Sequence, residues 1–299
     1  MEKTNKKNSS LTVNLAAWIL LIPSCLCVAA IVIRPAILSF LWSFFNMKGF
    51  NVLGFCGIEN YKRVLTDGVF LQALGNTIKY VLWSLVVGAA LPFIVAVVMN
   101  EMLHFRKFTR TMVYLPGIMP AVAVSLLWYF MFYPDQSGLL NMILGKLGIE
   151  PYVWLQDSRF TILYIIISMT WQGMGGTAIY YFAGLQGVNR EMYEAALIDG
   201  AGYFRRILTV TIPQMSGMLL LFLMRQCIAV FNIVDQPLQM TGGGPNNASV
   251  TLGLLNYRYA FQMYRPQFAM ALGCMMSVVM IIGAVLYMKA DQRNDNNRM

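Results

Sequence analysis

Six apolar stretches of bilayer length dominate this chain. Five contain no charged residue, and one is interrupted by a single arginine, Arg225. A helix of about 20 apolar residues crosses a hydrocarbon layer of about 30 Å, and within lipid only helices or closed barrels satisfy the backbone. The stretches lack the period-two alternation of barrel strands. The sequence therefore predicts an all-α polytopic membrane protein with six transmembrane helices, over residues 11–33, 80–99, 111–133, 160–186, 207–234 and 267–288.

Composition places nearly the whole chain in one membrane domain. Of its 299 residues, 58% are hydrophobic and 12% are charged, whereas soluble domains carry about 25% charged residues. The first apolar stretch follows three lysines, as in a secretion signal, but its length and the lack of a small-residue cleavage pattern indicate a retained helix. We expect an N-terminal tail over 1–10, a membrane domain over 11–288 and a C-terminal tail over 289–299.

The distribution of lysine and arginine predicts the orientation. With the N-terminus in the cytoplasm, twelve of the 22 Lys and Arg residues fall in inside segments, seven in outside segments and three at membrane depth or its border. Cytoplasmic loops carry the excess of positive charge in membrane proteins. Both termini are therefore predicted to be cytoplasmic, with outside loops over 46–79, 134–159 and 235–266.

Several function classes lack the residues that they need. The net charge of +9 is explained by topology, and no soluble basic platform for nucleic acid exists. The single histidine, His104, lies in a basic loop, and the five cysteines have no metal-type spacing. Residues 241–245 are rich in glycine, but no Gly-Lys-Ser/Thr follows, so they form no phosphate loop. We expect no catalytic residues, no metal site and no bound cofactor.

The most distinctive polar segment lies between the fourth and fifth apolar stretches. It contains Glu194-Ala195-Ala196, then Asp199-Gly200-Ala201-Gly202, and Pro213 fourteen residues after the aspartate. Residues 193–198 favour a helix, which Gly200 and Gly202 would end. The small side chains leave a surface on which a bulky partner can dock, and Glu194 offers a carboxylate to a basic residue. A solvated connecting helix is the alternative interpretation of the same pattern.

This segment resembles the cytoplasmic coupling segment of ABC importer permeases of the maltose-type sugar branch. Further similarities to that family occur in order along the chain: Phe55 with residues 57–61, residues 70–77, residues 106–110 with 114–116, residues 171–173, and residues 241–245. Each match alone is weak, but together and in order around six apolar stretches they are specific.

The resemblance implies a type I ABC importer permease fold and a bacterial inner-membrane location. It implies that the coupling segment, residues 187–212, inserts into an ATPase through Glu194, Ala195, Ala196, Asp199, Gly200 and Ala201. It also implies a second homologous permease, two cytoplasmic ATPase subunits that hold ATP and Mg, and an extracytoplasmic solute-binding protein. The chain itself is then a non-enzymatic subunit of an importer of sugars, oligosaccharides in particular.

A substrate path in such a protein needs polar side chains beside aromatic ones near the middle of the bilayer. The fourth and fifth apolar stretches supply that mixture in Trp171, Gln172, Gly173, Gly176, Arg225, Gln226, Phe231 and Asn232. Gln226 and Asn232 are equally compatible with simple hydrogen bonds between helices. Arg225 has three interpretations: a contact to an anionic substrate, a structural ion pair, or a charge that faces the cavity.

The rival class is an ion-coupled secondary transporter of a small polar solute. Such a protein would show internal repeats of matching hydropathy and intramembrane carboxylates that carry the coupling ion. No carboxylate lies within the six stretches, and Asp235, at an outer edge directly after the fifth, is the acidic residue nearest to one. The sequence therefore favours a permease driven by ATP hydrolysis on separate subunits.

Overall fold

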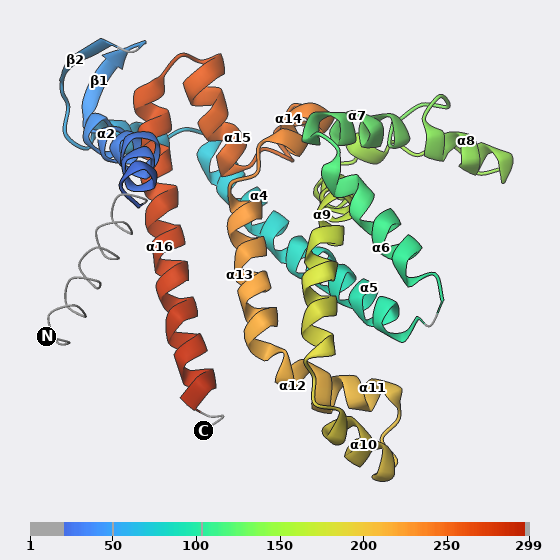
Figure 1. Ribbon diagram of the computed structural model, residues 1–299. Coiled ribbons are helices and arrows are strands. Elements are labelled where there is room, and N and C mark those ends of the chain that lie inside the picture. Colours follow the sequence, from blue (N-terminus) through green and yellow to red (C-terminus); the bar gives the residue numbers. More distant parts are fainter. Residues whose placement is uncertain (1–20, 50, 103, 297–299) are drawn as a thin grey trace, which may run out of the picture. The chain divides into compact units, whose positions relative to one another are not determined.

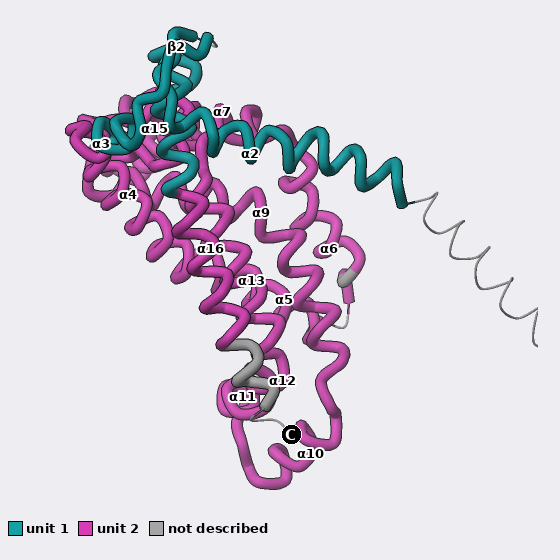
Figure 2. Tube along the Cα trace, turned by 90° about the vertical axis from the view of Figure 1, so that its left-hand side faces the viewer, with its two compact units in different colours: residues 1–64, 259–275 teal, residues 65–258, 276–299 magenta. Residues whose placement is uncertain are grey.

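The computed structural model describes residues 21–49, 51–102 and 104–296 and is almost entirely helical (Figure 1). This confirms the predicted all-α class. The predicted tail over 1–10 and the start of the first apolar stretch lie outside the described residues. The chain divides into two compact units, one formed by residues up to Val64 with Tyr259–Met275, the other by Leu65–Arg258 with Met276–Met299 (Figure 2).

Within the described residues, four continuous helices are long and apolar enough to cross a membrane. They cover Leu21–Trp42, Phe70–Glu101, Thr161–Gln186 and Pro266–Lys289. Two further helix pairs meet the same criteria but are sharply bent, Lys107–Ile118 with Ala121–Met131 by 99° and Tyr203–Gln214 with Ser216–Phe231 by 79°. Counting each bent pair as one span gives the six predicted transmembrane segments.

The first unit contains a short β-hairpin that the sequence interpretation did not predict. The elements of the first unit are η1 (Ala29–Ile33), α2 (Arg34–Trp42), β1 (Phe45–Lys48), β2 (Asn51–Phe55) and α3 (Glu59–Leu65). The strands pair antiparallel, with Phe45 opposite Phe55 and a bulge between Asn46 and Met47. The fully buried Asn60 donates to the carbonyls of Ser43 (2.8 Å) and Phe45 (2.9 Å), so it ties α3 to the hairpin.

The second unit holds the remaining spans. Its helices are α4 (Phe70–Trp83), η2 (Ser84–Gly88), α5 (Ala90–Glu101), α6 (Arg106–Tyr114), η3 (Leu115–Ile118), α7 (Ala121–Met131), α8 (Leu139–Lys146), η4 (Trp154–Gln156), α9 (Thr161–Gln186), α10 (Arg190–Ile198), α11 (Tyr203–Arg206), η5 (Ile207–Thr211), α12 (Ile212–Gln214), α13 (Ser216–Phe231), α14 (Asp235–Thr241) and α15 (Leu252–Tyr257). The helices η6 (Arg258–Gln262) and α16 (Pro266–Asn296) each have residues in both units. The last helix thus runs past its predicted end at residue 288.

Prolines explain the irregular turns of the spans. Pro120 forces the preceding Met119 into an extended conformation (ψ 142°), which ends η3 and produces the 99° bend. Of the four π-helical turns in the described residues, η6 ends before the separate helix α16 begins at Pro266. The other three, η1, η2 and η5, end two to four residues before a proline of the same helical span: Pro35, Pro92 and Pro213. Proline lacks a backbone donor and clashes with the carbonyl one turn earlier, so the wider turn relieves the local strain.

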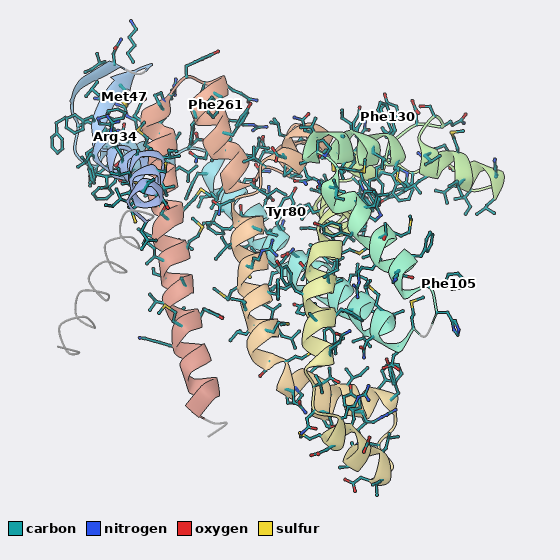
Figure 3. The ribbon with its side chains drawn as sticks, in the orientation of Figure 1. Arg34, Met47, Tyr80, Phe105, Phe130 and Phe261 are labelled. Atoms are coloured by element: carbon teal, nitrogen blue, oxygen red, sulfur yellow. The ribbon has the colours of Figure 1, made fainter. Side chains whose placement is uncertain are left out.

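The second span begins ten residues earlier than predicted. Asp67 accepts hydrogen bonds from the backbone N–H of Val69 through its side chain (2.8 Å) and of Phe70 through its carbonyl (3.0 Å). This local cap starts the helix at Phe70, within the predicted outside loop. In Figure 3, Tyr80 lies on α4, three residues before its end, and is fully buried, whereas Phe105 (79% exposed) and Phe130 (64% exposed) point outward.

Candidate translocation cavity and coupling helix

A cavity of about 460 Å³ lies within the second unit, halfway along its spans. Along α9 an apolar cluster around Ile165 precedes the cavity-lining residues 169–177, and a second cluster around Phe182 follows them. The reverse order holds along α13: Met215, just before its start, belongs to the cluster around Phe182, residues 222–229 line the cavity, and Val230 belongs to the cluster around Ile165. The cavity therefore lies near the middle of the membrane segments, between two clusters of packed apolar side chains.

Polar side chains on one wall of the cavity support the bend in the third span. Gln172 donates to the carbonyl of Met119 (3.1 Å), which the bend at Pro120 leaves without a helical partner. Gln236 in turn donates to the side-chain oxygen of Gln172 (3.1 Å). Gly175 lets this region pack closely, because a Cβ there would stand 2.2 Å from the carbonyl oxygen of Val113. The contacts connect α9, α14 and the bend.

Another part of the cavity wall contains two polar groups next to Gly88. A Cβ on Gly88 would stand 2.6 Å from Nε2 of Gln226 and 3.4 Å from Oγ1 of Thr170, so both groups approach the space that this glycine leaves open. Thr170 is 5% exposed, and its hydroxyl has no hydrogen-bond partner within the described part of the chain. Tyr114, Tyr181 and Phe222 also line the cavity. Amide, hydroxyl and aromatic groups thus surround one space.

Arg225 lines the same cavity. Its guanidinium lies 5.9 Å from the ring centre of Phe222. The two ion pairs found among the described residues, Glu59 with Arg63 and Asp157 with Arg159, do not involve it. Asp235, the nearest acidic residue in sequence, begins α14 and is not among the lining residues.

Five of the eight residues predicted for the substrate path line this cavity: Gln172, Gly173, Gly176, Arg225 and Gln226. The other three lie elsewhere. Trp171 packs edge-on against Trp128, with ring centres 5.8 Å apart. Phe231 lines a separate apolar pocket with residues of α4 and α16, and Asn232 donates to the carbonyl of Ile228 (3.0 Å).

Sequence reasoning did not single out several residues of the cavity wall. Thr170, Thr177, Tyr114, Tyr181 and Gln236 line it as well. Thr177 lies one turn from Gly173 on the helix, so a helical periodicity count from Gly173 would have identified it. Gln236 and Tyr114 reach the cavity from other segments, and no local pattern indicates that.

The predicted coupling helix forms as α10, and its boundaries follow from its caps. Asn189 accepts the N–H of Glu191 at its start (2.9 Å). At its end Gly200 adopts φ +73°, its N–H bonds to the carbonyl of Leu197 (3.0 Å), and that of Ala201 bonds to Ala196 (2.9 Å). This pair of bonds is the Schellman arrangement, which requires a left-handed residue, usually glycine.

Several contacts attach α10 to the start of the fifth span. The hydroxyl groups of Tyr193 and Thr211 are hydrogen-bonded, and the backbone N–H of Asn189 donates to the side-chain oxygen of Gln214 (3.0 Å). The guanidinium of Arg206 lies 6.0 Å from the ring centre of Tyr193. A movement of α10 would therefore be transmitted to the segment that leads into α13.

The outward side of α10 is open and partly apolar. Glu194, Ala195, Asp199 and Gly200 are exposed, Ala196 and Ala201 are partly so. Ile198 is 87% exposed and Leu197 is 53% exposed. Exposed apolar side chains of this kind next to a carboxylate are typical of a surface that a partner protein covers.

On the opposite side of the unit, the loop over residues 241–251 is held in one conformation. Asn76 donates to the carbonyls of Asn247 (2.8 Å) and Val250 (3.0 Å). Arg258 donates to the carbonyl of Gly242 (2.6 Å), and Gly243 (φ +91°) leaves space for that guanidinium, since a Cβ would stand 2.5 Å from it. The peptide bond between Gly244 and Pro245 is cis. The loop is thus a preformed surface.

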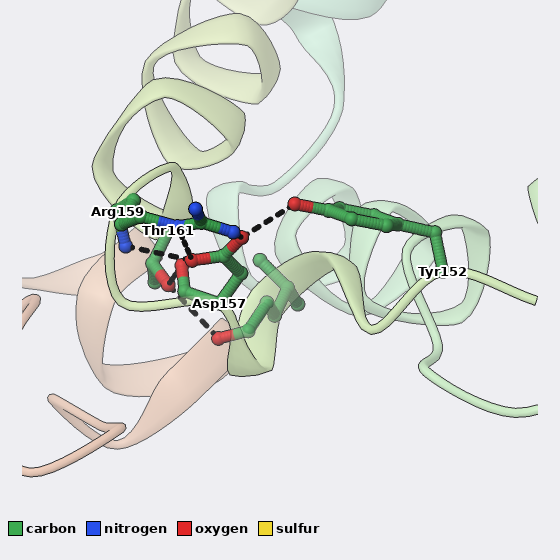
Figure 4. A network of polar contacts seen from close by, with 5 residues as sticks. Tyr152, Asp157, Arg159 and Thr161 are labelled. Carbon is green, nitrogen blue, oxygen red and sulfur yellow. Dashed lines mark hydrogen bonds and ion pairs between the residues drawn. The ribbon is translucent and has the colours of Figure 1, made fainter.

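The loop before α9 contains the second ion pair (Figure 4). Arg159 binds Asp157 with two hydrogen bonds of 3.0 and 2.8 Å, and the Tyr152 hydroxyl donates to the same carboxylate (2.5 Å). These contacts, first that of Arg159, hold the pKa of Asp157 well below its usual range. The bond to Asp157 raises the pKa of Tyr152 to about 12. Thr161 closes the loop by donating to the carbonyl of Asp157 (2.7 Å).

Comparison with known families decides what kind of membrane protein this is. The family described as binding-protein-dependent transport system inner membrane component matches residues 88–296, which include the cavity wall, α10 and the loop over 241–251. The chain belongs to this family. It is therefore a multi-pass inner-membrane protein and a permease component of a binding-protein-dependent transport system.

Individual relatives extend the similarity over the full length. The probable ABC transporter permease protein YurN of Bacillus subtilis is 31% identical, over 84% of this chain and 85% of YurN. The lactose transport system permease protein LacF of Rhizobium radiobacter is 30% identical, over 97% of both chains.

A solved structure confirms the type I importer permease fold. A chain of a bacterial ABC transporter, described as involved in the import of the acidic polysaccharide alginate, superposes with a TM-score of 0.83. The superposition covers 96% of this permease and 99% of that chain at 21% sequence identity. The two chains thus share one fold over nearly their whole length.

Proposed function

We propose that this permease forms the translocation path of an ATP-driven importer of sugars, including oligosaccharides. The observation that carries the proposal is that one compact unit contains both a polar cavity halfway along its spans and an exposed helix, α10, attached to the foot of a span that lines the cavity. Such an arrangement links a partner on one side of the membrane to a substrate site inside it.

The chemistry of the cavity supports a sugar substrate. Sugars are bound by hydrogen bonds to their hydroxyl groups and by aromatic contact with the apolar faces of the ring. Thr170, Thr177 and Gln226 provide the first kind of group, and Tyr181 and Phe222 the second. Relatives named for the transport of lactose and of arabinooligosaccharides support the same substrate class.

The importer is an assembly in this proposal. Two cytoplasmic ATPase subunits hold ATP and Mg, and one of them receives Glu194, Ala195, Ala196, Asp199, Gly200 and Ala201 in a cleft. A second, homologous permease completes the cavity, and both termini lie in the cytoplasm. An extracytoplasmic solute-binding protein docks on the outer face, where the rigid loop over 241–251 gives it a preformed contact.

Transport then proceeds by alternating access. Closure of the ATPase subunits moves α10, and the contacts of Tyr193 with Thr211 and of Asn189 with Gln214 pass that movement to the fifth span. The cavity opens to the outside in one state and to the cytoplasm in the other. The two states must differ by only a few kcal/mol, so that ATP and substrate can shift the population.

The test is co-purification of an ATPase with the tagged permease in a mild detergent. We expect the wild type to bring down an ATPase, and Glu194→Lys to lose it because the reversed charge repels the basic residue that receives the carboxylate. Glu150→Lys makes the same charge change in the outer loop and serves as the matched control. A wild-type permease that transports a sugar while it elutes alone would contradict the proposal and favour a secondary transporter.

A further inference from the structure

The charge on the cavity wall indicates which kind of sugar the cavity binds. The proposed function leaves this point open. Arg225 is the only charged side chain among the eighteen described residues that line the cavity. A cation in the middle of a membrane segment is costly and is usually paired or directed into a polar cavity. The described cavity wall therefore carries a positive charge, and no carboxylate among its described lining residues neutralises that charge.

The packing around Arg225 leaves its hydrogen-bonding capacity toward the cavity open. Its described close contact is the ring of Phe222, 5.9 Å from Cζ, which supports the cation from one side without using its N–H groups. Within the described residues no carboxylate lies within 4.0 Å of it, as the two ion pairs of the chain are elsewhere. Guanidinium N–H groups in this position match a planar acidic group on a ligand.

Other free donors on the wall complete the arrangement. The hydroxyl group of Thr170 is buried and unpartnered in the described structure, and the amide nitrogen of Gln226 stands beside it over Gly88. The amide nitrogens of Gln172 and Gln236 each already donate one hydrogen bond, to the carbonyl of Met119 and to the side-chain oxygen of Gln172. Beside the guanidinium, which can only donate, the Thr170 hydroxyl and the Gln226 amide thus offer further O–H and N–H groups to the oxygens of an anion.

We infer that the cavity takes a sugar that carries an acidic group, a carboxylate or a phosphate, and that Arg225 pairs with this group. The inference rests on the proposed function and narrows its substrate class. A neutral sugar gives no charge compensation to Arg225, whereas an anion offsets the cost of placing a cation within a membrane segment.

The test uses the purified assembly of both permeases and the ATPase subunits in lipid nanodiscs. Two pairs of probes are titrated while the intrinsic tryptophan fluorescence is followed: galacturonobiose against its neutral counterpart galactobiose, and glucose 6-phosphate against glucose. The variants are Arg225→Gln, which removes the charge, and Arg225→Lys, which keeps it. Lys79→Gln removes a positive charge on an exposed face of α4, away from the cavity, and is the control.

We expect one acidic probe or both to bind about tenfold more tightly than the neutral counterpart, since charged hydrogen bonds are the stronger ones. The preference should weaken as ionic strength rises, disappear in Arg225→Gln, persist in reduced form in Arg225→Lys and remain in Lys79→Gln. The pair that shows the larger preference distinguishes a carboxylate from a phosphate.

Equal binding of the acidic and neutral members of both pairs overturns the inference, as does a preference that survives in Arg225→Gln. A second permease that dissociates from Arg225→Gln but not from Arg225→Lys also overturns it, because Arg225 would then pair with a carboxylate of that subunit. A failure of the proposed function would give a different result from a failure of this inference. The wild-type permease would then purify without any ATPase, so that no assembly could be prepared.

Discussion

Two glycines show how single residues shape the path. Gly175 allows α9 to approach the end of α6 so closely that a methyl group would overlap the backbone of Val113 and Tyr114. Gly88 leaves the space into which Gln226 and Thr170 project. Gly175 therefore allows close helix packing, and Gly88 provides space in the cavity. This difference arises from the atoms that surround each glycine, because the residue type is the same.

At the same scale, Asp157 makes the stability of the outer loop depend on pH. Its pKa is lowered in the folded protein by Arg159 and Tyr152, so the ionised carboxylate stabilises the fold at every pH above the usual aspartate value of about 4. The contribution is lost as the pH falls below that value toward the folded-state pKa. We expect the melting temperature of the wild type to exceed that of Asp157→Asn at neutral pH.

The measurement is thermal unfolding in detergent from neutral pH down to about pH 3, a range that crosses the usual aspartate pKa. The difference between the two proteins should stay constant down to about pH 5 and shrink below it. A difference that does not change across this range would show that the carboxylate charge does not stabilise the loop.

At the scale of elements, the bends and π-helical turns are readable from the prolines, while the start of the second span is not. The π-helical turns η1, η2 and η5 each lie just before a proline of the same span, and these prolines are visible in the sequence. The start at Phe70 depends on the hydrogen bonds of Asp67, and the hairpin over 45–55 depends on Asn60 from α3. A hydropathy profile of the sequence does not reveal either of these contacts.

The coupling helix provides a prediction at this scale. Gly200→Trp should uncouple ATP hydrolysis from transport, because a side chain there strains the left-handed residue at the end of α10 and covers the small surface of Ala196 and Ala201. Gly148→Trp is the matched control, since Gly148 has the same φ of +73° with open space around it but lies in the outer loop.

The experiment compares ATPase activity and sugar uptake of the reconstituted importer. The Gly200 variant should hydrolyse ATP without the stimulation that substrate-loaded binding protein produces, and uptake should fall by at least about tenfold, the scale of one lost charged hydrogen bond or docking contact. Normal uptake in Gly200→Trp would count against the docking of α10 in an ATPase.

At the scale of the whole molecule, the six spans and their loops predict which segments each side of the membrane reaches. Residues 187–212 should face the cytoplasm together with both termini, and residues 134–159 the outside. In a variant without native cysteines, Ser137→Cys should react with a membrane-impermeant maleimide in spheroplasts. Asp199→Cys should react only after permeabilisation. The opposite pattern would reverse the orientation and with it the side on which an ATPase binds.

The amino-acid sequence by itself determined the class of the protein, the number of its spans and the position of α10, because these depend on local properties. Apolar length, helix propensity and a terminating glycine act within about 20 residues of each other. The resemblance to importer permeases also followed from short ordered motifs, and the family match confirmed it.

Only the tertiary structure decided which polar residues share the cavity. Gln172, Gly173, Gly176, Arg225 and Gln226 line it, whereas Trp171, Phe231 and Asn232 pack elsewhere. The side of a helix that meets a cavity depends on the crossing of helices and on the bends at Pro120 and Met215. A position within an apolar stretch does not specify this direction. For the same reason, the donors that surround Arg225 became visible only once α5, α9 and α13 were brought together.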